Sequence, residues 1–445
     1  MLPAVTHDAI VVGAGLSGLV CARRLADAGL DVMVLEARGR VGGRLLAGRV
    51  GDTVVDLGGQ WMTTGQPRLA ALAAELGVAS IPQLREGRAF VAEAEAGILA
   101  QLGAALAQWR AVRRIERSAR ELDGALGGDE ATSASIAREH EALDVSLEAW
   151  LREAIGNPIA RDRIALHAEL VLAAEPAELS ALFYFSILGV TGGFRPPGPE
   201  LPGGGREHRF AGSAWSLAER LAGGLDVRLA EPVLAIDDDD GDVALQIRTA
   251  RETHAAHRAV LALPPAFARR IEVALAPAAA RLAAASRVGP VVKCFAVYER
   301  PFWRDAGWSG EAYRPHGAVR ATVALAPDPI LLAFVVGAHA AGWSRRAPAD
   351  RRGEVLATFA AQFGDAASAP LAYAEHDWGA DPWAAGCVAG LPPGVLSRGA
   401  AWGAPYGRIH IAGTESAATW PGYMEGAIEA GERAAAEVTA ALRGD

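Results

Sequence analysis

The N-terminal forty residues alternate between short apolar runs and a segment with helical periodicity. Residues 9–12 form an uninterrupted apolar run that predicts a buried strand. Residues 17–28 repeat apolar side chains at helical spacing, and 31–35 predict a second strand that ends at Glu36. The order strand, helix, strand is typical of a parallel βαβ unit.

The pattern changes farther along the chain. Residues 95–190 are rich in Ala, Leu, Arg and Glu and predict helices, most clearly at 101–122. Residues 330–343 are apolar and rich in β-formers, so they predict a buried strand and its turn. The Pro- and Gly-rich segment 195–205 predicts a crossover between domains. The acidic run 237–242 predicts a solvated turn between two strands, because it lacks the ligand spacing of a calcium loop.

Composition narrows the class of protein. A chain of 445 residues, 51% hydrophobic and 21% charged, predicts a packed globular protein of about two domains. The net charge of −9 argues against a nucleic-acid partner. Three widely spaced cysteines favour a reducing, cytoplasmic compartment over a disulfide framework. No secretory signal and no apolar run of membrane-spanning length is visible, so we expect a soluble protein without a membrane partner.

A glycine motif lies between the first strand and the first helix. Residues 13–18 read GAGLSG, and the acid Glu36 follows at the end of the second strand. In this context Gly13 permits a tight turn, Gly15 lets the backbone approach a pyrophosphate, and Gly18 permits close packing of helix and strand. The free N–H groups of the helix would bind the phosphates, and Glu36 the ribose hydroxyls. The motif therefore predicts a dinucleotide site that disfavours NADP.

Two further glycine pairs follow, in VGGR (41–44) and LGGQW (57–61). Neither fits inside a regular helix or strand. They form either ordinary turns or backbone pressed against a large flat ligand, with Arg44 neutralising a phosphate. Their position just after the dinucleotide motif favours the second interpretation.

Lys293 is the only lysine in the chain. The other 42 residues of the Lys-plus-Arg total of 43 are arginines. Chance survival is one explanation, since Asn157 is likewise the only asparagine. The other is that position 293 needs a compact, strongly hydrated ammonium, which a planar guanidinium cannot copy.

Several segments together resemble the flavin-containing monoamine oxidase family. LEARGRVGGR (35–44) and DLGGQW (56–61) are similar to its first motifs, and RIHIAGTESAATWPGYMEGAIEAGERAA (408–435) to its second flavin-binding motif. Further landmarks match in order: HRFAGS (208–213), EPVLAID (231–237), LALPP (261–265), RVGPVVKCF (287–295) and ERPFW (299–303). The resemblance implies an FAD-dependent oxidase. It would remove a hydride equivalent from the carbon next to an amine nitrogen and give an imine, then aldehyde or ketone and ammonia, with hydrogen peroxide.

The resemblance also implies a fold of the α/β class. A discontinuous Rossmann-like FAD-binding domain would comprise residues 1–78, 206–285 and 391–445. A second, α+β substrate-binding domain would comprise 79–205 and 286–390. Membrane-bound members continue into a spanning helix, whereas this chain ends at Asp445, so a soluble member is expected. The expected partners are a small-molecule amine and oxygen, with a homodimer as a possible assembly.

The family motifs imply which residues contact FAD, and no metal is implied. The helix that begins near Met424 would direct its N-terminus at the flavin, where reduction builds negative charge, and Trp378 would pack against the dimethylbenzene ring. The implied cofactor-binding residues are Gly13, Gly15, Gly18, Glu36, Arg38, Gly43, Arg44, Gly59, Gln60, Trp61, Val233, Trp378, Cys387, Gly413, Thr414, Glu415, Gly422 and Met424.

Lys293 and Tyr423 are the implied catalytic residues. Lys293 matches the family lysine that holds a water against flavin N5. Tyr423 matches one ring of the aromatic cage around the substrate nitrogen, but Val388 replaces the second ring, which predicts a wider or differently shaped substrate. Arg206 replaces an uncharged amide of the substrate cavity and either turns to solvent or binds a substrate carboxylate.

Two alternatives remain open: how FAD is attached at Cys387, and which reaction the protein catalyses. Cys387 matches a cysteine that joins the flavin 8α-methyl by a thioether in some members, whereas in others FAD is tightly bound without that bond. An L-amino-acid oxidase that uses Arg206 as a carboxylate clamp is the alternative activity. A flavoprotein desaturase or a non-catalytic flavin-binding protein is a third possibility, which retention of Lys293 disfavours.

Overall fold

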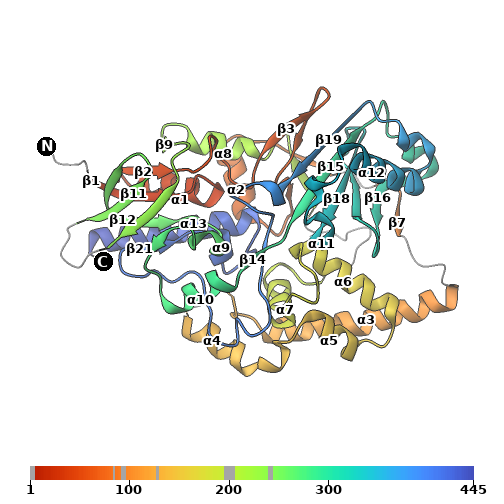
Figure 1. Ribbon diagram of the computed structural model, residues 1–445, viewed down its shortest axis with the longest axis horizontal. Helices are drawn as coiled ribbons and strands as arrows, with labels where there is room; N and C mark the ends of the chain where they lie inside the picture. Colours follow the sequence, from red (N-terminus) through yellow and green to blue (C-terminus); the bar gives the residue numbers. More distant parts are fainter. Residues whose placement is uncertain are drawn as a thin grey trace.

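The structure is a computed structural model that describes residues 6–83, 86–91, 97–126, 130–194, 206–238 and 244–444. Figure 1 shows two sheets side by side, with a group of helices beneath the second sheet. The expected α/β class is confirmed. The predicted crossover 195–205 lies outside the described residues.

An eight-stranded sheet organises the N- and C-terminal parts of the chain. Its order is β13-β10-β11-β12-β1-β2-β9, and β21 also pairs with β12. The strands are β1 (Thr6–Val12), β2 (Val32–Leu35), β9 (Asp226–Arg228), β10 (Val233–Asp237), β11 (Leu245–Thr249), β12 (Thr253–Leu261), β13 (Glu272–Val273) and β21 (Ile409–Ile411). β1 runs parallel to both β2 and β12, so the predicted βαβ unit is confirmed at the centre of this sheet.

Two helices cover one region of this sheet and pack against each other. They are α1 (Leu16–Asp27) and α13 (Met424–Arg443). The contact is close because a Cβ atom added at Gly431 would lie 2.4 Å from the carbonyl oxygen of Ser17. The antiparallel pair β10 and β11 flanks the predicted acidic turn, of which residues 239–242 lie outside the described residues.

A six-stranded sheet forms the second half of the molecule. Its order is β19-β15-β18-β17-β16-β7, antiparallel except where β7 joins β16. The strands are β7 (Arg88–Val91), β15 (Val291–Val297), β16 (Trp308–Tyr313), β17 (Val319–Ala324), β18 (Ile330–Val336) and β19 (Ala372–Asp377). The strand predicted within 330–343 is confirmed as β18, and a short helix, α11 (Gly337–Ala340), follows it.

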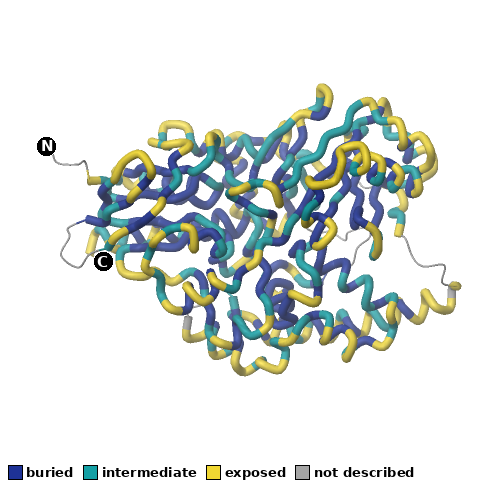
Figure 2. The backbone as a smooth tube through the Cα atoms, in the orientation of Figure 1, coloured by how far each residue is buried: buried dark blue, intermediate teal, exposed yellow. Residues whose placement is uncertain are grey.

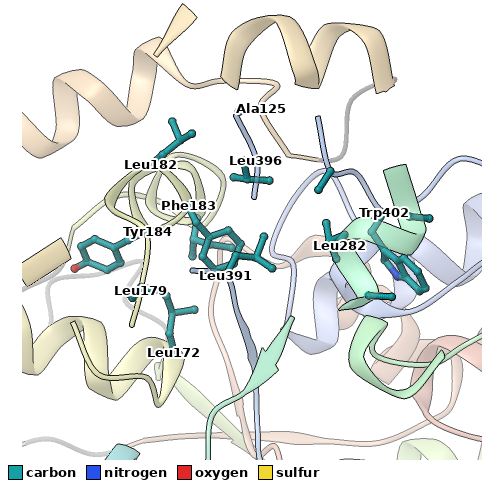
Figure 3. Packing of buried hydrophobic residues seen from close by; sticks show 14 of the residues in the cluster. Ala125, Leu172, Leu179, Leu182, Phe183, Tyr184, Leu282, Leu391, Leu396 and Trp402 are labelled. Atoms are coloured by element: carbon teal, nitrogen blue, oxygen red, sulfur yellow. The ribbon is translucent and has the colours of Figure 1, made fainter. Parts of the chain in front are cut away.

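Five helices come from the region predicted as helical, and Figure 1 shows them below the two sheets. They are α3 (Ile98–Glu121), α4 (Glu130–Glu139), α5 (Leu147–Ala154), α6 (Pro158–Leu172) and α7 (Ala181–Val190). α7 is buried along most of its length because its residues are almost all apolar. Figure 3 shows Leu182 and Phe183 of α7 packed beside Leu391 and Leu396, which joins these helices to the C-terminal part of the chain.

Further helices and strands complete the fold. The remaining helices are α2 (Pro67–Glu75), α8 (Trp215–Ala222), α9 (Pro265–Ala268), α10 (Pro277–Ala285) and α12 (Pro348–Phe363). The remaining strands are β3 (Ala47–Val50), β4 (Thr53–Asp56), β5 (Trp61–Met62), β6 (Ser80–Pro82), β8 (His208–Phe210), β14 (Arg287–Val288) and β20 (Ala389–Gly390). Figure 2 shows that the central strands of both sheets are mostly buried, while exposed residues gather in loops and on outer helices.

The strands of the two sheets come from interleaved parts of the sequence. The eight-stranded sheet draws on residues 6–35, 226–273 and 409–411, and the six-stranded sheet on 88–91 and 291–377. The proposed domain boundaries remain a prediction. Among the described residues, no helix has both the length and the apolar character needed to cross a membrane.

Candidate active site

A cavity of about 640 Å³, called here the main cavity, is lined by residues from both sheets and from the helices beneath them. Its lining runs from Val12 in the first strand to Ala427 in the last helix. All the implied cofactor, catalytic and substrate residues line it, except Gly18 and Glu415. Tertiary folding therefore gathers residues that are hundreds of positions apart.

The glycine motif shapes one end of the main cavity. Gly13 has φ +107°, a conformation that favours glycine, and Gly15 is the N-cap of α1. A Cβ atom at Gly18 would lie 2.0 Å from the carbonyl oxygen of Gly13. Gly18 therefore acts on packing between helix and strand, while Gly13 and Gly15 line the cavity. The N-terminus of α1 has no side-chain cap, as expected where a phosphate would accept from its N–H groups.

Glu36 is buried at the end of β2, beside this helix terminus. Its two carboxylate oxygens accept hydrogen bonds from the backbone N–H groups of Ala14 and Arg38, both at 2.8 Å. These bonds hold the carboxylate in place and leave lone pairs for ribose hydroxyls. Arg38 is paired with Asp381 through an Nη2–Oδ1 contact of 2.9 Å.

Arg44 and Glu415 form a partly buried ion pair at the edge of the main cavity. Nη1 of Arg44 lies 2.8 Å from Oε1 of Glu415 and donates to the carbonyl oxygen of Cys387 at 2.6 Å. Burial lowers the pKa of Arg44, but the charge and hydrogen bond of Glu415 outweigh this effect and raise it overall. Arg44 thus remains a cation that faces the cavity, while Glu415 supports it from outside the lining.

The N-terminus of α13 faces the opposite part of the cavity. Tyr423 is its N-cap and provides no side-chain cap hydrogen bond, and Met424 and Ala427 also line the cavity. Thr414 holds this turn, because its hydroxyl donates to the carbonyl oxygen of Tyr423 at 2.8 Å and accepts from Gly422 N–H at 3.1 Å. Gly422 has φ +86°. These uncapped N–H groups suit a partner that carries negative charge.

The lining therefore fits an extended FAD on the structure's own geometry. The helix terminus with Glu36 suits the adenosine diphosphate half, and the terminus of α13 suits a flavin ring that gains negative charge on reduction. Trp378 is 3% exposed, and its indole Nε1–H donates to Leu57 O at 2.8 Å, which fixes a flat apolar wall between these ends.

Lys293 lies in β15, between β18 and β19, and is 6% exposed. Its Nζ donates to Asp56 O at 3.1 Å, Gly58 O at 2.6 Å and Gln60 Oε1 at 2.5 Å. Three acceptors match the three donors of an ammonium, an arrangement that a planar guanidinium cannot reproduce. This geometry favours the chemical explanation for the only lysine over chance survival.

Two charged groups near this site have shifted pKa values. Burial lowers the pKa of Lys293 to about 8, and the nearby Asp56 carboxylate opposes the shift. Burial also raises the pKa of Asp56 to about 6, against the opposing effects of the Ser213 hydroxyl and Lys293. The Asp56 carboxylate accepts from the Ser213 hydroxyl at 2.5 Å and from Ala214 N–H at 3.0 Å.

Aromatic and charged side chains form the part of the cavity near Lys293. The rings of Trp61 and Phe334 lie 5.7 Å from Lys293 Nζ. Arg206 donates to the hydroxyl of Tyr313 at 2.6 Å, and its guanidinium carbon lies 5.5 Å from the centre of the Trp61 ring. Arg206 lines the main cavity, which favours the cavity-facing interpretation over the solvent-facing one.

Tyr423 and Val388 lie on the wall near the start of α13. The Tyr423 ring meets Trp420 edge to face at 5.1 Å. Val388 packs against Gly422, where an added Cβ atom would lie 2.8 Å from Val388 Cγ1. One aromatic ring and one aliphatic side chain therefore occupy the positions predicted for the cage.

Cys387 is exposed to the main cavity, and the segment around it has strained backbone. Gly386 has φ +145°, and a Cβ atom there would lie 2.2 Å from Gly289 O. Burial raises the pKa of the Cys387 thiol, although Arg44 and Lys293 lower it. Since the thiolate is the nucleophile, a raised pKa lowers the reactivity of this thiol, and covalent attachment of FAD at Cys387 stays an open alternative. Cys21, Cys294 and Cys387 are all free thiols.

Several site residues were missed by the sequence reasoning. Asp56 lies within the DLGGQW motif, but its role depends on Lys293, which is 237 positions away. Tyr313, Phe334 and Trp420 carry no sequence signal that separates them from ordinary core aromatics. Only the packing of β16, β18 and the turn before α13 brings them to one cavity.

The chain is similar to known proteins along nearly its whole length. A family model for flavin containing amine oxidoreductase matches residues 16–439. A Mycobacterium tuberculosis protein named as a flavin-containing monoamine oxidase is 34% identical over 455 residues, covering 99% of this chain and 98% of its own. An L-amino acid dehydrogenase of Synechocystis is 31% identical, covering 99% and 97%. A solved triple mutant of putrescine oxidase has a TM-score of 0.88 and 28% identity, covering 99% of this chain and 100% of its own.

Proposed function

Because the chain belongs to the family of flavin-containing amine oxidoreductases, we propose that its main cavity holds FAD with the isoalloxazine ring beside Lys293. The protein is an FAD-dependent oxidase of small-molecule amines with oxygen as acceptor. A hydride equivalent leaves the carbon next to the amine nitrogen, and the resulting imine is hydrolysed to an aldehyde or ketone and ammonia. Bound FAD supplies the two-electron acceptor and passes the electrons to oxygen, which becomes hydrogen peroxide.

The observation that carries the site proposal is the buried ammonium of Lys293 on the wall of the main cavity. A fixed positive charge stabilises negative charge that develops on oxygen during its reduction, and burial strengthens this effect. Rotation of one Nζ–H from Gln60 to a water would also let Lys293 order that water. Gln60 is suited to such an exchange, since its buried Nε2 has no hydrogen-bond partner among the residues that the structure describes.

Tyr423, Val388 and the aromatic rings around Arg206 would orient the substrate. Tyr423 offers the face of one ring to an amine cation, while Val388 leaves more room than a second ring would. The expected substrate is therefore a primary or secondary amine with a bulky carbon skeleton.

The experiment that tests this activity uses the purified yellow protein without oxygen. Adding a substrate amine from a panel bleaches the flavin absorbance, and admitting air restores it with one equivalent of peroxide. A protein that keeps its oxidised spectrum with every amine and amino acid tested contradicts the proposal.

Arg206 favours a second candidate, an oxidase of amino acids. Its guanidinium borders the cavity beside Trp61 and Tyr313 and suits a substrate carboxylate. Under this proposal, Arg206→Gln lowers kcat/KM for a carboxylate-bearing amine by roughly 10- to 150-fold, which corresponds to a loss of about 1.5–3 kcal/mol of binding. The value for its decarboxylated analogue stays within about twofold. Equal losses on both members of the pair contradict the clamp.

We also propose a cytoplasmic location and a homodimer. The three free thiols support a reducing compartment. Cell fractionation and light scattering of the purified holoenzyme test these two points; recovery in an oxidising compartment or a monomer mass contradicts them.

A further inference from the structure

A second cavity, called here the side chamber, lies directly behind one wall of the main cavity. Its volume is about 60 Å³. Val388 and Gly422 line both cavities. These two residues are in close contact, since a Cβ atom on Gly422 would lie 2.8 Å from Val388 Cγ1. Val388 and Gly422 therefore form a boundary that the side chamber and the main cavity share.

Most of the side chamber is apolar. Its lining comes from helices of both halves of the molecule and from the segment around β20, and Figure 3 shows several of these side chains close together. They include Phe183, Leu282, Leu391, Leu396 and Trp402. At the outer end the lining includes the exposed Ala404. The chamber therefore runs from the surface near Ala404 to the wall of the main cavity.

Three buried polar atoms on this lining have no hydrogen-bond partner within the described part of the chain: Ser286 Oγ, Trp402 Nε1 and Glu415 Oε2. Ser286 is 3% exposed and Trp402 6%. All three residues line the side chamber and none lines the main cavity, so bound FAD would not meet them. Buried polar atoms are nearly always satisfied by protein or ordered water, and this set offers one donor, one acceptor and one hydroxyl that does both.

The size of the side chamber restricts what can occupy it. A volume of 60 Å³ corresponds to roughly two water molecules. An amine substrate of several carbon atoms is too large, whereas water, dioxygen and hydrogen peroxide fit. The apolar walls suit dioxygen, and the three polar atoms suit water and peroxide.

We propose that the side chamber is a hydrated passage that brings dioxygen to the reacting end of the main cavity and releases hydrogen peroxide, separately from the amine. In the reaction each dioxygen takes two electrons and two protons and leaves as one hydrogen peroxide. Side-chain rotation of Val388 opens the wall to molecules of this size, and the amine remains confined to the main cavity. This inference rests on the proposed oxidase function.

Two substitutions would narrow the passage at different points. Ser286→Leu adds apolar bulk inside the chamber and removes the hydroxyl, and Ala404→Trp covers its exposed outer end. Ala361→Trp, at an exposed position of α12, is the matched control. If Ser286→Leu does not fold, the oxygen reaction of Ala404→Trp alone tests the passage.

The measurement mixes chemically reduced holoenzyme with oxygenated buffer and records reoxidation of the flavin. We expect the second-order rate constant for oxygen to fall on the order of tenfold in Ser286→Leu and Ala404→Trp, and to stay unchanged in Ala361→Trp. Anaerobic reduction by the amine should remain within twofold in all three. An unchanged oxygen rate constant in either folded variant whose crystal structure shows the passage filled overturns the proposal.

A crystal structure of the wild-type holoenzyme provides a readout that does not depend on activity. Ordered water within hydrogen-bond distance of the three polar atoms is expected, and a dry chamber overturns the hydrated passage. Because the protein is reduced chemically, the oxygen measurement holds even if no amine reduces the flavin. Failure of every amine to reduce the flavin would contradict the proposed function, but it would not contradict the passage.

Discussion

Lys293 connects β15 of the six-stranded sheet to three oxygens of the segment 56–60, two from the backbone and one from a side chain. We predict that Lys293→Met retains FAD but slows flavin reduction or reoxidation by roughly 10²–10³, because a preorganised charge at the reacting end is lost. Lys293→Arg should also be slow, since a guanidinium keeps the charge but cannot satisfy three converging acceptors. Stopped-flow traces of both half-reactions measure the effect, and wild-type rates in Lys293→Met contradict it.

Asp56 sets the charge of Lys293 and should therefore shape the pH profile. With the Asp56 pKa at about 6 and the Lys293 pKa at about 8, both groups are charged between these values. Because Lys293 stays protonated below its pKa, oxygen reactivity should change little through about pH 6 and fall as pH passes about 8. Removing the negative charge lowers the Lys293 pKa, because Asp56 attracts the ammonium, so Asp56→Asn should move the alkaline limb to lower pH.

The other titratable groups near Lys293 are Cys387 and His376, and both are retained in this variant. Asp52→Asn, an exposed position in the same hairpin, should leave the profile of flavin reoxidation against pH unchanged. An alkaline limb that stays in place in Asp56→Asn excludes the proposed coupling.

At the scale of the elements, Gly431 of α13 is needed for close packing of α13 against α1, and not for a turn. A Cβ atom at Gly431 would lie 2.4 Å from Ser17 O and 3.1 Å from Val20 Cβ. We predict that Gly431→Ala lowers the free energy of unfolding by about 1–3 kcal/mol, since the two backbones must separate. It should also weaken FAD binding, because α1 and α13 both present their N-termini to the main cavity.

Gly353 in α12 is the matched control, because it is exposed and an added Cβ atom there would meet nothing within 4 Å. Gly353→Ala should stabilise the protein by up to about 1 kcal/mol through helix propensity alone. Urea unfolding in excess FAD measures the change in the free energy of unfolding for Gly431→Ala and for Gly353→Ala. Equal changes at the two positions would refute the packing argument.

For the whole molecule, the main cavity gathers segments from the beginning, middle and end of the chain. FAD bound there should stabilise the folded state by mass action, by about 2.7 kcal/mol when free FAD exceeds its Kd a hundredfold. Removing FAD should therefore lower Tm, and returning FAD should restore it in proportion to the logarithm of its concentration. Circular dichroism melts measure this, and a Tm independent of FAD contradicts binding in the main cavity.

Local sequence patterns by themselves determined the helices and strands whose formation depends on short-range properties of the chain. The apolar runs and the glycine motif predicted β1, α1 and β2, because strand burial, helical spacing and the φ angle of Gly13 are short-range properties. The long helix at 101–122 was predicted for the same reason and is α3. The lysine at position 293 could be singled out by its rarity, and the family by motifs spread along the chain.

Tertiary structure alone decided what surrounds those residues. The three acceptors of Lys293 come from a loop more than 230 positions earlier, and no local pattern encodes that contact. The same holds for Glu415, which the sequence predicts as a cofactor residue but which supports Arg44 from behind the cavity wall. The side chamber lies where segments around α7, α10, β20 and the turn before α13 pack imperfectly. Its unpartnered polar atoms follow from that packing, because satisfaction of a buried group depends on neighbours in space and not on neighbours in sequence.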